Sequence, residues 1–241
     1  MATSNRPLDR RSGKTLRSPV IAERLIAAYH GGVVELDWSN PFELLVATIL
    51  SAQSTDRKVN EITPGLFARF PDPAAFVAAD EQDVEAAIYQ TGFYRQKTKA
   101  IRGASAALLE RHEGEVPLSI ADLVALPGVA RKTANVVLAA AAPDAHAADP
   151  DAGVAVDTHV KRLARRFGLT RETDPDKIER DLMRLWPKDQ WPRASLATIL
   201  HGRRVCEARR PRCADCLVED LCPSSLVAGC RDKAGQAQGL G

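Results

Sequence analysis

Four cysteines near the C-terminus form the densest group of reactive side chains in the sequence. Their spacing is C-x6-C-x2-C-x5-C, and they are Cys206, Cys213, Cys216 and Cys222. The segment between them is charged and lacks the apolar companions that buried cysteines need, so the pattern favours metal binding. Disulfides are the competing interpretation. The first residues contain no apolar secretory stretch, which argues against export and therefore against disulfides.

Spacing alone leaves the metal open, because zinc and a 4Fe-4S cluster both accept four thiolates. Structural zinc usually takes two C-x2-C pairs. This segment has one such pair with wider gaps on either side. The pattern favours a cuboidal cluster whose four irons are each reached separately.

A second chemical feature is the sequence LPGVARKTAN at residues 126–135. Pro127 and Gly128 predict a tight turn, and a helix follows from about Arg131. Unpaired amides and the positive end of the dipole make such a helix N-terminus a phosphate site. Lys132 falls in its first turn, where the dipole disfavours the protonated amine, as a nucleophile requires. The alternative is an ordinary helical corner with a solvated lysine.

Asp157 precedes a helical pattern in VDTHVKRLARRF, residues 156–167. We expect it to cap that helix, a contribution of about 1 kcal/mol. A capping carboxylate can still keep one oxygen for chemistry. Asp157 is therefore either a helix cap only or a helix cap that also takes part in a reaction.

The segments that must position the cysteines, Lys132 and Asp157 have apolar residues at helical spacing. Asn40 and Pro41 supply a cap and a first-turn proline before an apolar i, i+3, i+4, i+7 stripe. Alternation typical of strands is hard to find. The sequence predicts an all-α protein, with further helices at residues 21–29, 131–142, 158–167, 174–186 and 193–203. Residues 139–153, rich in small residues, predict an exposed loop joining two subdomains.

Composition excludes several classes of protein. The 241 residues are 45% hydrophobic and 27% charged, as in ordinary globular chains, and no apolar run reaches the roughly 20 residues that span a bilayer. Residues 1–18 predict a basic mobile arm of a cytoplasmic protein. The net charge of +2 indicates no partner by itself. Basic residues nevertheless crowd the C-terminal half, as Lys161, Arg162, Arg165, Arg166, Arg203 and Arg204, which suggests a polyanion or simply a solvated face.

Taken together, these motifs resemble the endonuclease III family of helix-hairpin-helix DNA glycosylases with AP-lyase activity. The stretches NPFELLVATILSAQSTD at 40–56 and TGFYRQKTKAI at 91–101 are similar to the same family, and the resemblance spans about residues 41–223. It implies two helical domains flanking a DNA-binding cleft: a six-helix barrel at 34–144 with the hairpin, and an iron-sulfur domain at 19–33 and 145–223. Residues 224–241, with Cys230, would form a flexible tail.

The resemblance also implies residue roles. The chain would be a monomeric, nucleoid-associated enzyme that removes oxidised pyrimidines from double-stranded DNA and cuts at abasic sites, with Lys132 as nucleophile, Asp157 as essential carboxylate and a 4Fe-4S cluster on the four cysteines. Gln53 and Phe93 would fill the gap left by the flipped nucleotide. Phosphates would be held by the amides of Gly128 and Ala130 and by Arg209, Arg210 and Arg212. His201 is expected to be a packing or hydrogen-bond partner.

Two positions depart from the family pattern. Ala130 replaces a glycine, which would be strained if the position needs a positive φ, and Phe93 replaces the common leucine. Rival hypotheses are an adenine-specific mismatch glycosylase, disfavoured by Lys132 and the short tail, a non-catalytic zinc-containing DNA-binding protein, and a metal-storage protein.

Overall fold

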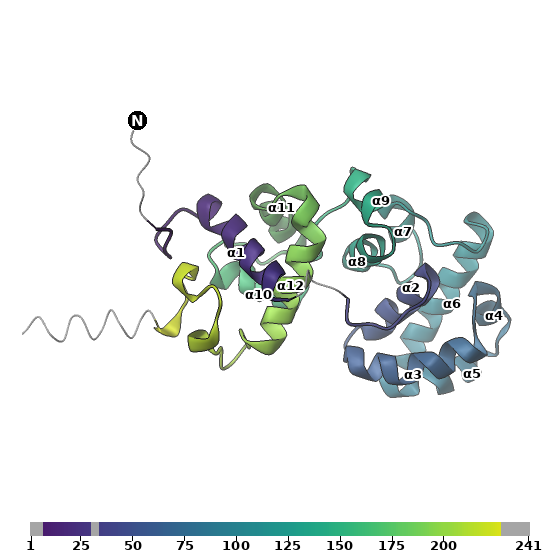
Figure 1. The fold of residues 1–241 in the computed structure, drawn as a ribbon. Helices are drawn as coiled ribbons and strands as arrows, with labels where there is room; N and C mark the ends of the chain where they lie inside the picture. Colours follow the sequence, from purple (N-terminus) through teal and green to yellow (C-terminus); the bar gives the residue numbers. More distant parts are fainter. Residues whose placement is uncertain (1–6, 30–33, 228–241) are drawn as a thin grey trace, which may run out of the picture. The chain divides into compact units, whose positions relative to one another are not determined.

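The computed structural model describes residues 7–29 and 34–227, and the regular secondary structure of these residues is entirely helical, without a strand (Figure 1). The predicted all-α class is confirmed. The chain divides into two compact units. One unit comprises residues 34–152, and the other combines residues 1–33 with residues 153–241. Each unit has its own hydrophobic core.

The 34–152 unit is built around helix α2, Pro41–Ser51, which packs against α3, α6 and α8 (Figure 1). Asn40 caps α2 by accepting a hydrogen bond from the amide of Glu43, so the predicted helix start is confirmed. The remaining elements are α3 (Asp56–Arg69), α4 (Pro73–Ala78), α5 (Glu81–Ile88), η1 (Tyr89–Thr91), α6 (Tyr94–Arg111), α7 (Ile120–Val124), α8 (Arg131–Ala141) and α9 (Pro143–Ala148).

The second unit packs the N-terminal helix α1, Lys14–Ala28, against α11 and α12. Helix α10, Thr158–Arg166, packs on the same two helices. Their apolar stripes meet in a core that includes Ile21, Leu163 and Leu182. Here α11 is Pro175–Leu185, the short turn η2 (Lys188–Gln190) lies between it and α12 (Trp191–Arg204), and η3 (Cys213–Asp215) and η4 (Glu219–Leu221) follow α12.

The basic arm is shorter than the sequence predicts. Helix α1 begins at Lys14, so residues 14–18 are helical. Arg17 is buried, and its guanidinium donates to the carbonyls of Phe167 at 2.9 Å and Leu221 at 2.6 Å. Arg17 lies one turn before Ile21 on the buried face of α1. Its guanidinium therefore binds backbone carbonyls inside the unit and is not part of a mobile arm. Residues 1–6 of the predicted arm and most of the predicted tail lie outside the described residues.

Residues 139–153 do not form the predicted exposed loop. Helix α8 continues to Ala141 and the short helix α9 follows. His146 is buried with its Nε2 3.2 Å from Oδ1 of Asn135, and Asp149 accepts a 2.7 Å hydrogen bond from the amide of Ile120. These contacts hold residues 145–152 in the 34–152 unit rather than in the other domain, to which the sequence assigns them.

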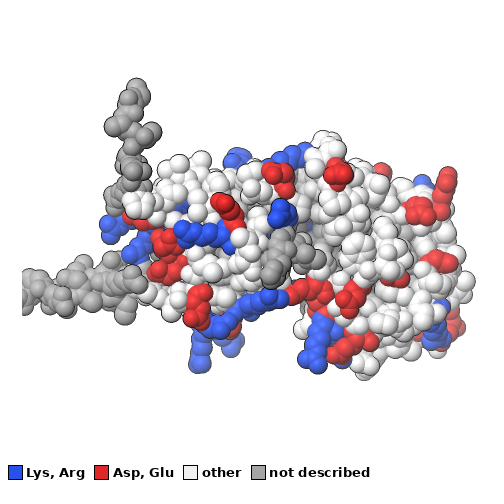
Figure 2. All heavy atoms as spheres, viewed as in Figure 1, with Lys and Arg blue, Asp and Glu red and all other residues white. Residues whose placement is uncertain are grey.

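Acidic and basic side chains are interspersed on the face shown in Figure 2, in keeping with the small net charge. Within the described ranges, every helix is too short or too polar to cross a bilayer.

Candidate functional site

The predicted hairpin lies between α7 and α8. Gly128 has a φ of +77°, and a Cβ on it would collide with Cβ of Ala100 in α6. Glycine is therefore required both by the backbone conformation and by the close approach of α6. Ala130 has an extended backbone with a φ of −81°, so the strain considered for this alanine does not arise.

Helix α8 has no side-chain cap at its N-terminus, where Ala130 is the cap residue. The first-turn amides of such a helix need partners from outside it. Lys132 lies in this turn and is half-buried. Arg131 beside it donates to the carbonyl of Asp151 at 2.9 Å. The turn thus combines a helix N-terminus suited to a phosphate with a primary amine.

Asp157 caps α10 with one carboxylate oxygen. Its Oδ1 accepts from the amides of His159 and Val160, each at 2.8 Å. Within its own unit, the described residues donate no hydrogen bond to Oδ2. The cap therefore leaves one oxygen for other chemistry, as its sequence position suggested. Lys132 belongs to the 34–152 unit and Asp157 to the other.

Gln53 and Phe93 share an unusual backbone conformation. Their φ angles are 53° and 49°, in the left-handed region that non-glycine residues seldom adopt. Both side chains are exposed, Phe93 to 57%. Left-handed backbone at a non-glycine residue costs roughly 1–2 kcal/mol, and such strain clusters at functional sites. The two residues predicted to enter DNA are therefore both held in strained, outward-facing turns of one unit.

The four cysteines line one hollow of about 260 Å³. All four thiols are free, and burial raises the pKa of Cys216 to about 11 and that of Cys222 to about 12. In the described part of the chain, three or more ligating side chains do not converge on a point that fits a single ion. The residues fit a larger group, since four thiols line a hollow of a size that would admit more than one ion.

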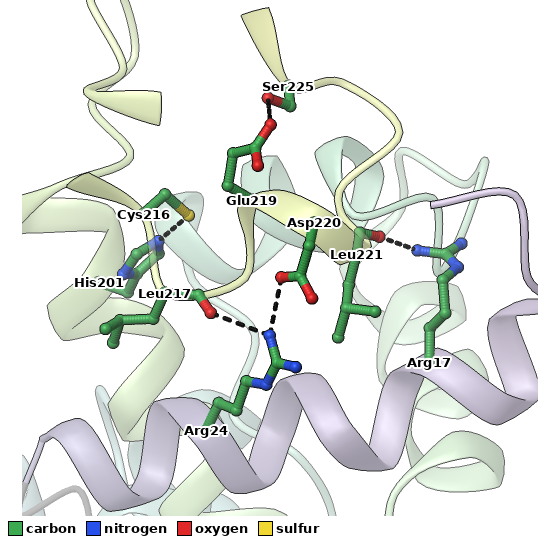
Figure 3. Close-up of polar contacts among 9 residues, drawn as sticks. All are labelled: Arg17, Arg24, His201, Cys216, Leu217, Glu219, Asp220, Leu221 and Ser225. Carbon is green, nitrogen blue, oxygen red and sulfur yellow. Dashed lines mark hydrogen bonds and ion pairs between the residues drawn. The ribbon is translucent and has the colours of Figure 1, made fainter. Parts of the chain in front are cut away.

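Two nitrogen groups lie beside these sulfurs. The Nε2 atom of His201 is 3.4 Å from Sγ of Cys216 (Figure 3). Its Nδ1 atom is 2.9 Å from the hydroxyl of Tyr29. Burial lowers the pKa of His201 to about 4, so the ring is neutral at pH 7. The Nη1 atom of Arg166 lies 3.2 Å from Sγ of Cys206. A cation and a ring N–H suit thiolates, and the expected hydrogen-bonding role of His201 is confirmed.

Two arginines of helix α1 bind the cysteine segment, residues 206–222. Arg24 donates to the carbonyl of Leu217 at 3.2 Å and pairs with Asp220 at 2.7 Å, and Arg17 reaches Leu221 (Figure 3). Sequence reasoning missed both arginines and Tyr29. For Arg17 the sequence did contain a signal: it lies four residues before Ile21, on the same apolar face of the helix, which indicates a buried position.

Three arginines of the cysteine segment were predicted to contact DNA. Arg209 and Arg210 are exposed and form no ion pair with the described residues. Arg212 instead donates to the carbonyl of Arg204 and lies 3.9 Å from Asp215. The segment therefore presents two uncommitted cations and one that is engaged in its own fold.

A second cationic feature lies along α10. We call it the basic hollow: about 740 Å³, lined by Lys161, Arg162, Arg165, Arg166 and Arg171 with Thr158, Thr170 and Ser224. Arg162 and Arg166 donate to backbone carbonyls of the cysteine segment, including that of Cys206. Lys161, Arg165 and Arg171 form no ion pair or hydrogen bond with described residues. Five cations without a lining carboxylate suit a polyanion.

Comparisons with known proteins agree with this arrangement. Residues 46–188 match the family described as HhH-GPD superfamily base excision DNA repair protein. The chain is 50% identical over 221 residues to endonuclease III of Synechocystis sp., covering 92% of this chain and 98% of the relative. It is 42% identical over 188 residues to endonuclease III of Escherichia coli (strain K12), covering 78% and 86%.

Two solved structures have the same fold at 35% identity, each covering 90% of this chain and 99% of the other. One is described as a non-covalent endonuclease III–DNA complex, with a TM-score of 0.81. The other is described as a trapped endonuclease III–DNA covalent intermediate, with a TM-score of 0.82.

Proposed function

This chain belongs to the endonuclease III family within the HhH-GPD superfamily, and from that premise we propose that it is a bifunctional DNA glycosylase and AP lyase of base excision repair. The observation that carries the proposal is Lys132, a primary amine in the uncapped first turn after a glycine hairpin. The test is borohydride trapping: the protein incubated with a duplex containing one oxidised pyrimidine should form a covalent adduct and release the base. Binding without adduct would favour a non-catalytic DNA-binding protein.

The reaction begins with extrusion of the damaged nucleotide, since an enzyme cannot reach the glycosidic bond inside the stack. Gln53 and Phe93 fill the gap. The Phe93 ring stacks on the orphaned partner base, a contact of about 1–3 kcal/mol for an aromatic side chain. Poorly stacked oxidised pyrimidines reduce the cost of extrusion, which gives the proposed substrate preference.

Lys132 then attacks the anomeric carbon of the extruded sugar. Its Nζ–C1′ bond forms as the bond from C1′ to the base breaks, and the base leaves with a proton. Opening of the sugar ring gives the Schiff base, which acidifies the proton on C2′. Loss of that proton expels the 3′ oxygen and cuts the strand. The amine is essential because water in its place would stop at base removal.

Asp157 stabilises the positive charge that develops on the sugar, using the oxygen that the helix cap leaves available. Asp157→Asn should lower base excision by about 10²–10³-fold while leaving thermal stability nearly unchanged, because asparagine caps as well as aspartate. Asp157→Ala should lose the same activity and also about 1 kcal/mol of stability. Single-turnover rates and thermal melts separate the two effects.

The matched control is Asp174→Ala, which removes the cap of α11, where Asp174 accepts from the amide of Lys177. It should cost stability and leave the excision rate unchanged. Full activity in Asp157→Asn would show that this carboxylate is only a cap.

DNA phosphates are held in this proposal by the amides of the Gly128 hairpin, by Arg209 and Arg210, and by the basic hollow. The double variant Arg165→Ala/Arg171→Ala should reduce the slope of log affinity against log salt by about two, since each lost phosphate contact removes about 0.9. The control is Lys177→Ala/Arg184→Ala, because both residues are paired with carboxylates in the same unit. Equal slopes for the two double variants would remove the basic hollow from the DNA interface.

We further propose that Cys206, Cys213, Cys216 and Cys222 hold a 4Fe-4S cluster. The support is the shared hollow, with Arg166 and His201 placed to donate to two of the sulfurs. These residues would hold the cluster in a structural role, fixing the surrounding chain, and the proposed reaction would need no electrons from it, because base release and elimination transfer none. A monomeric state and a nucleoid location remain predictions.

A further inference from the structure

Lys97 is a buried lysine that the reaction proposed above does not use. It lies in α6 of the 34–152 unit, with 5% of its surface exposed. Burial lowers its pKa, yet no carboxylate among the described residues pairs with it. An ammonium is costly to bury unless polar groups hold it. Its position therefore calls for a reason beyond packing.

Two backbone carbonyls hold this ammonium. The Nζ atom of Lys97 donates to the carbonyl of Leu50 at 2.7 Å and to that of Thr91 at 2.9 Å. Leu50 is in the last turn of α2, and Thr91 ends η1. The C-terminal carbonyls of helices carry partial negative charge, so a cation between two of them is well placed. One side chain thus ties together the ends of two elements distant in sequence.

Each of these elements leads directly into one of the strained turns. Gln53 follows Leu50 by three residues, and Phe93 follows Thr91 by two, both with left-handed φ. The amide of Lys97 also donates to the carbonyl of Phe93 at 3.1 Å. Strained backbone persists only where its surroundings over-determine it.

Two hydroxyl groups near these turns bond only within their own segment of the chain. The hydroxyl of Ser51 donates to Thr48 within α2, and that of Thr91 donates to Ile88 just before η1. One exposed bond also crosses between these regions, from Nζ of Lys58 to Oε1 of Gln90 at 3.3 Å. Among the described residues, Lys97 is the buried side chain whose hydrogen bonds reach backbone carbonyls beside both turns.

We propose that Lys97 is a positioning residue, which fixes the turns that carry Gln53 and Phe93 relative to each other so that both side chains enter the DNA gap together. The inference rests on the proposed glycosylase function. It assigns Lys97 to the extrusion of a paired nucleotide and not to chemistry at the sugar. A substrate without a partner strand therefore should not need it.

The test compares two substrates in single-turnover experiments. Lys97→Met keeps the length of the side chain and loses both hydrogen bonds. We expect it to lower base excision from a duplex containing one oxidised pyrimidine by tenfold or more. Cleavage of an unpaired abasic oligonucleotide should stay within twofold of wild type. Similar losses on both substrates would overturn the proposal.

A double-mutant cycle with Phe93→Ala gives a readout that general destabilisation would not move. Because Lys97 also positions Gln53, Lys97→Met should lower excision by a smaller factor in the Phe93→Ala background than in the wild-type protein. Fully multiplicative losses would contradict the proposal. Fluorescence of 2-aminopurine opposite the lesion should report weaker extrusion in Lys97→Met.

Should Lys97→Met not fold, as judged by circular dichroism, Lys97→Arg replaces it. A guanidinium keeps the charge but does not place one nitrogen between the two carbonyls, so a smaller loss confined to the duplex is expected. Wild-type rates on both substrates would then overturn the inference. Failure of the proposed function itself is distinguishable, because the wild-type protein would form no borohydride adduct with either substrate.

Discussion

Lys132→Ala is expected to abolish strand cleavage at abasic sites and borohydride trapping, with a rate decrease on the order of 10³-fold or more. The reason is that the proposed intermediate is a Schiff base on the Lys132 amine, and alanine has no amine with which to form it. The uncapped turn of α8 would still present its amides to a phosphate, so DNA affinity should change little. Gel-based cleavage and adduct assays, together with binding at fixed salt, measure the two quantities separately.

Lys132→Arg is the sharper control for charge. A guanidinium stays protonated at any working pH and is not a nucleophile, so this variant should bind DNA as wild type and form no adduct. Cleavage by Lys132→Ala at the wild-type rate would refute the covalent mechanism. Loss of binding in both variants would instead assign Lys132 to DNA affinity.

Cys222→Ser is expected to prevent folding of the unit formed by residues 1–33 and 153–241. Binding of a structural metal by thiolates contributes about 10 kcal/mol or more to folding, which is comparable with the whole stability of a domain. The variant should lose iron and the visible absorption of the cluster, and its helical content should fall. Iron analysis and circular dichroism measure both effects.

Cys230→Ser is the matched control, because Cys230 lies outside the proposed ligand set. It should retain iron and helicity. If Cys222→Ser kept the full iron content, Cys222 would not be a ligand. If the protein contained zinc and no iron, the proposal of a 4Fe-4S cluster would be refuted in favour of a zinc site on the same cysteines.

Features determined by residues adjacent in the sequence, such as helix caps and turns, were predictable. The cap at Asp157 follows from an aspartate before an apolar stripe, and the hairpin follows from a proline and glycine before a helix. Strain at Ala130 depends on a positive φ, and the structure shows that this condition is not met, because the backbone there is extended. Gly128 is instead the residue that takes the positive φ. A motif names the residues of a turn but does not assign each φ angle.

Features set by tertiary partners were not predictable in the same way. Lys97 continues the stripe of Ile101, Ala104 and Leu108, so periodicity marks its position as buried. The carbonyls that hold its ammonium come from elements far away in the chain, and no local pattern reveals them. The same is true of Asp149, whose bond to Ile120 keeps residues after α8 folded.

The partnership of α1 with α11 and α12 has a consequence for biosynthesis. On the ribosome, α1 emerges first, but the helices that cover its apolar face are translated more than a hundred residues later. The 34–152 unit is translated before α11 and α12 and, with its own core, is able to fold while they are being made. In that interval the apolar face of α1 lacks the helices that cover it and is exposed to chaperones or to other unfolded chains.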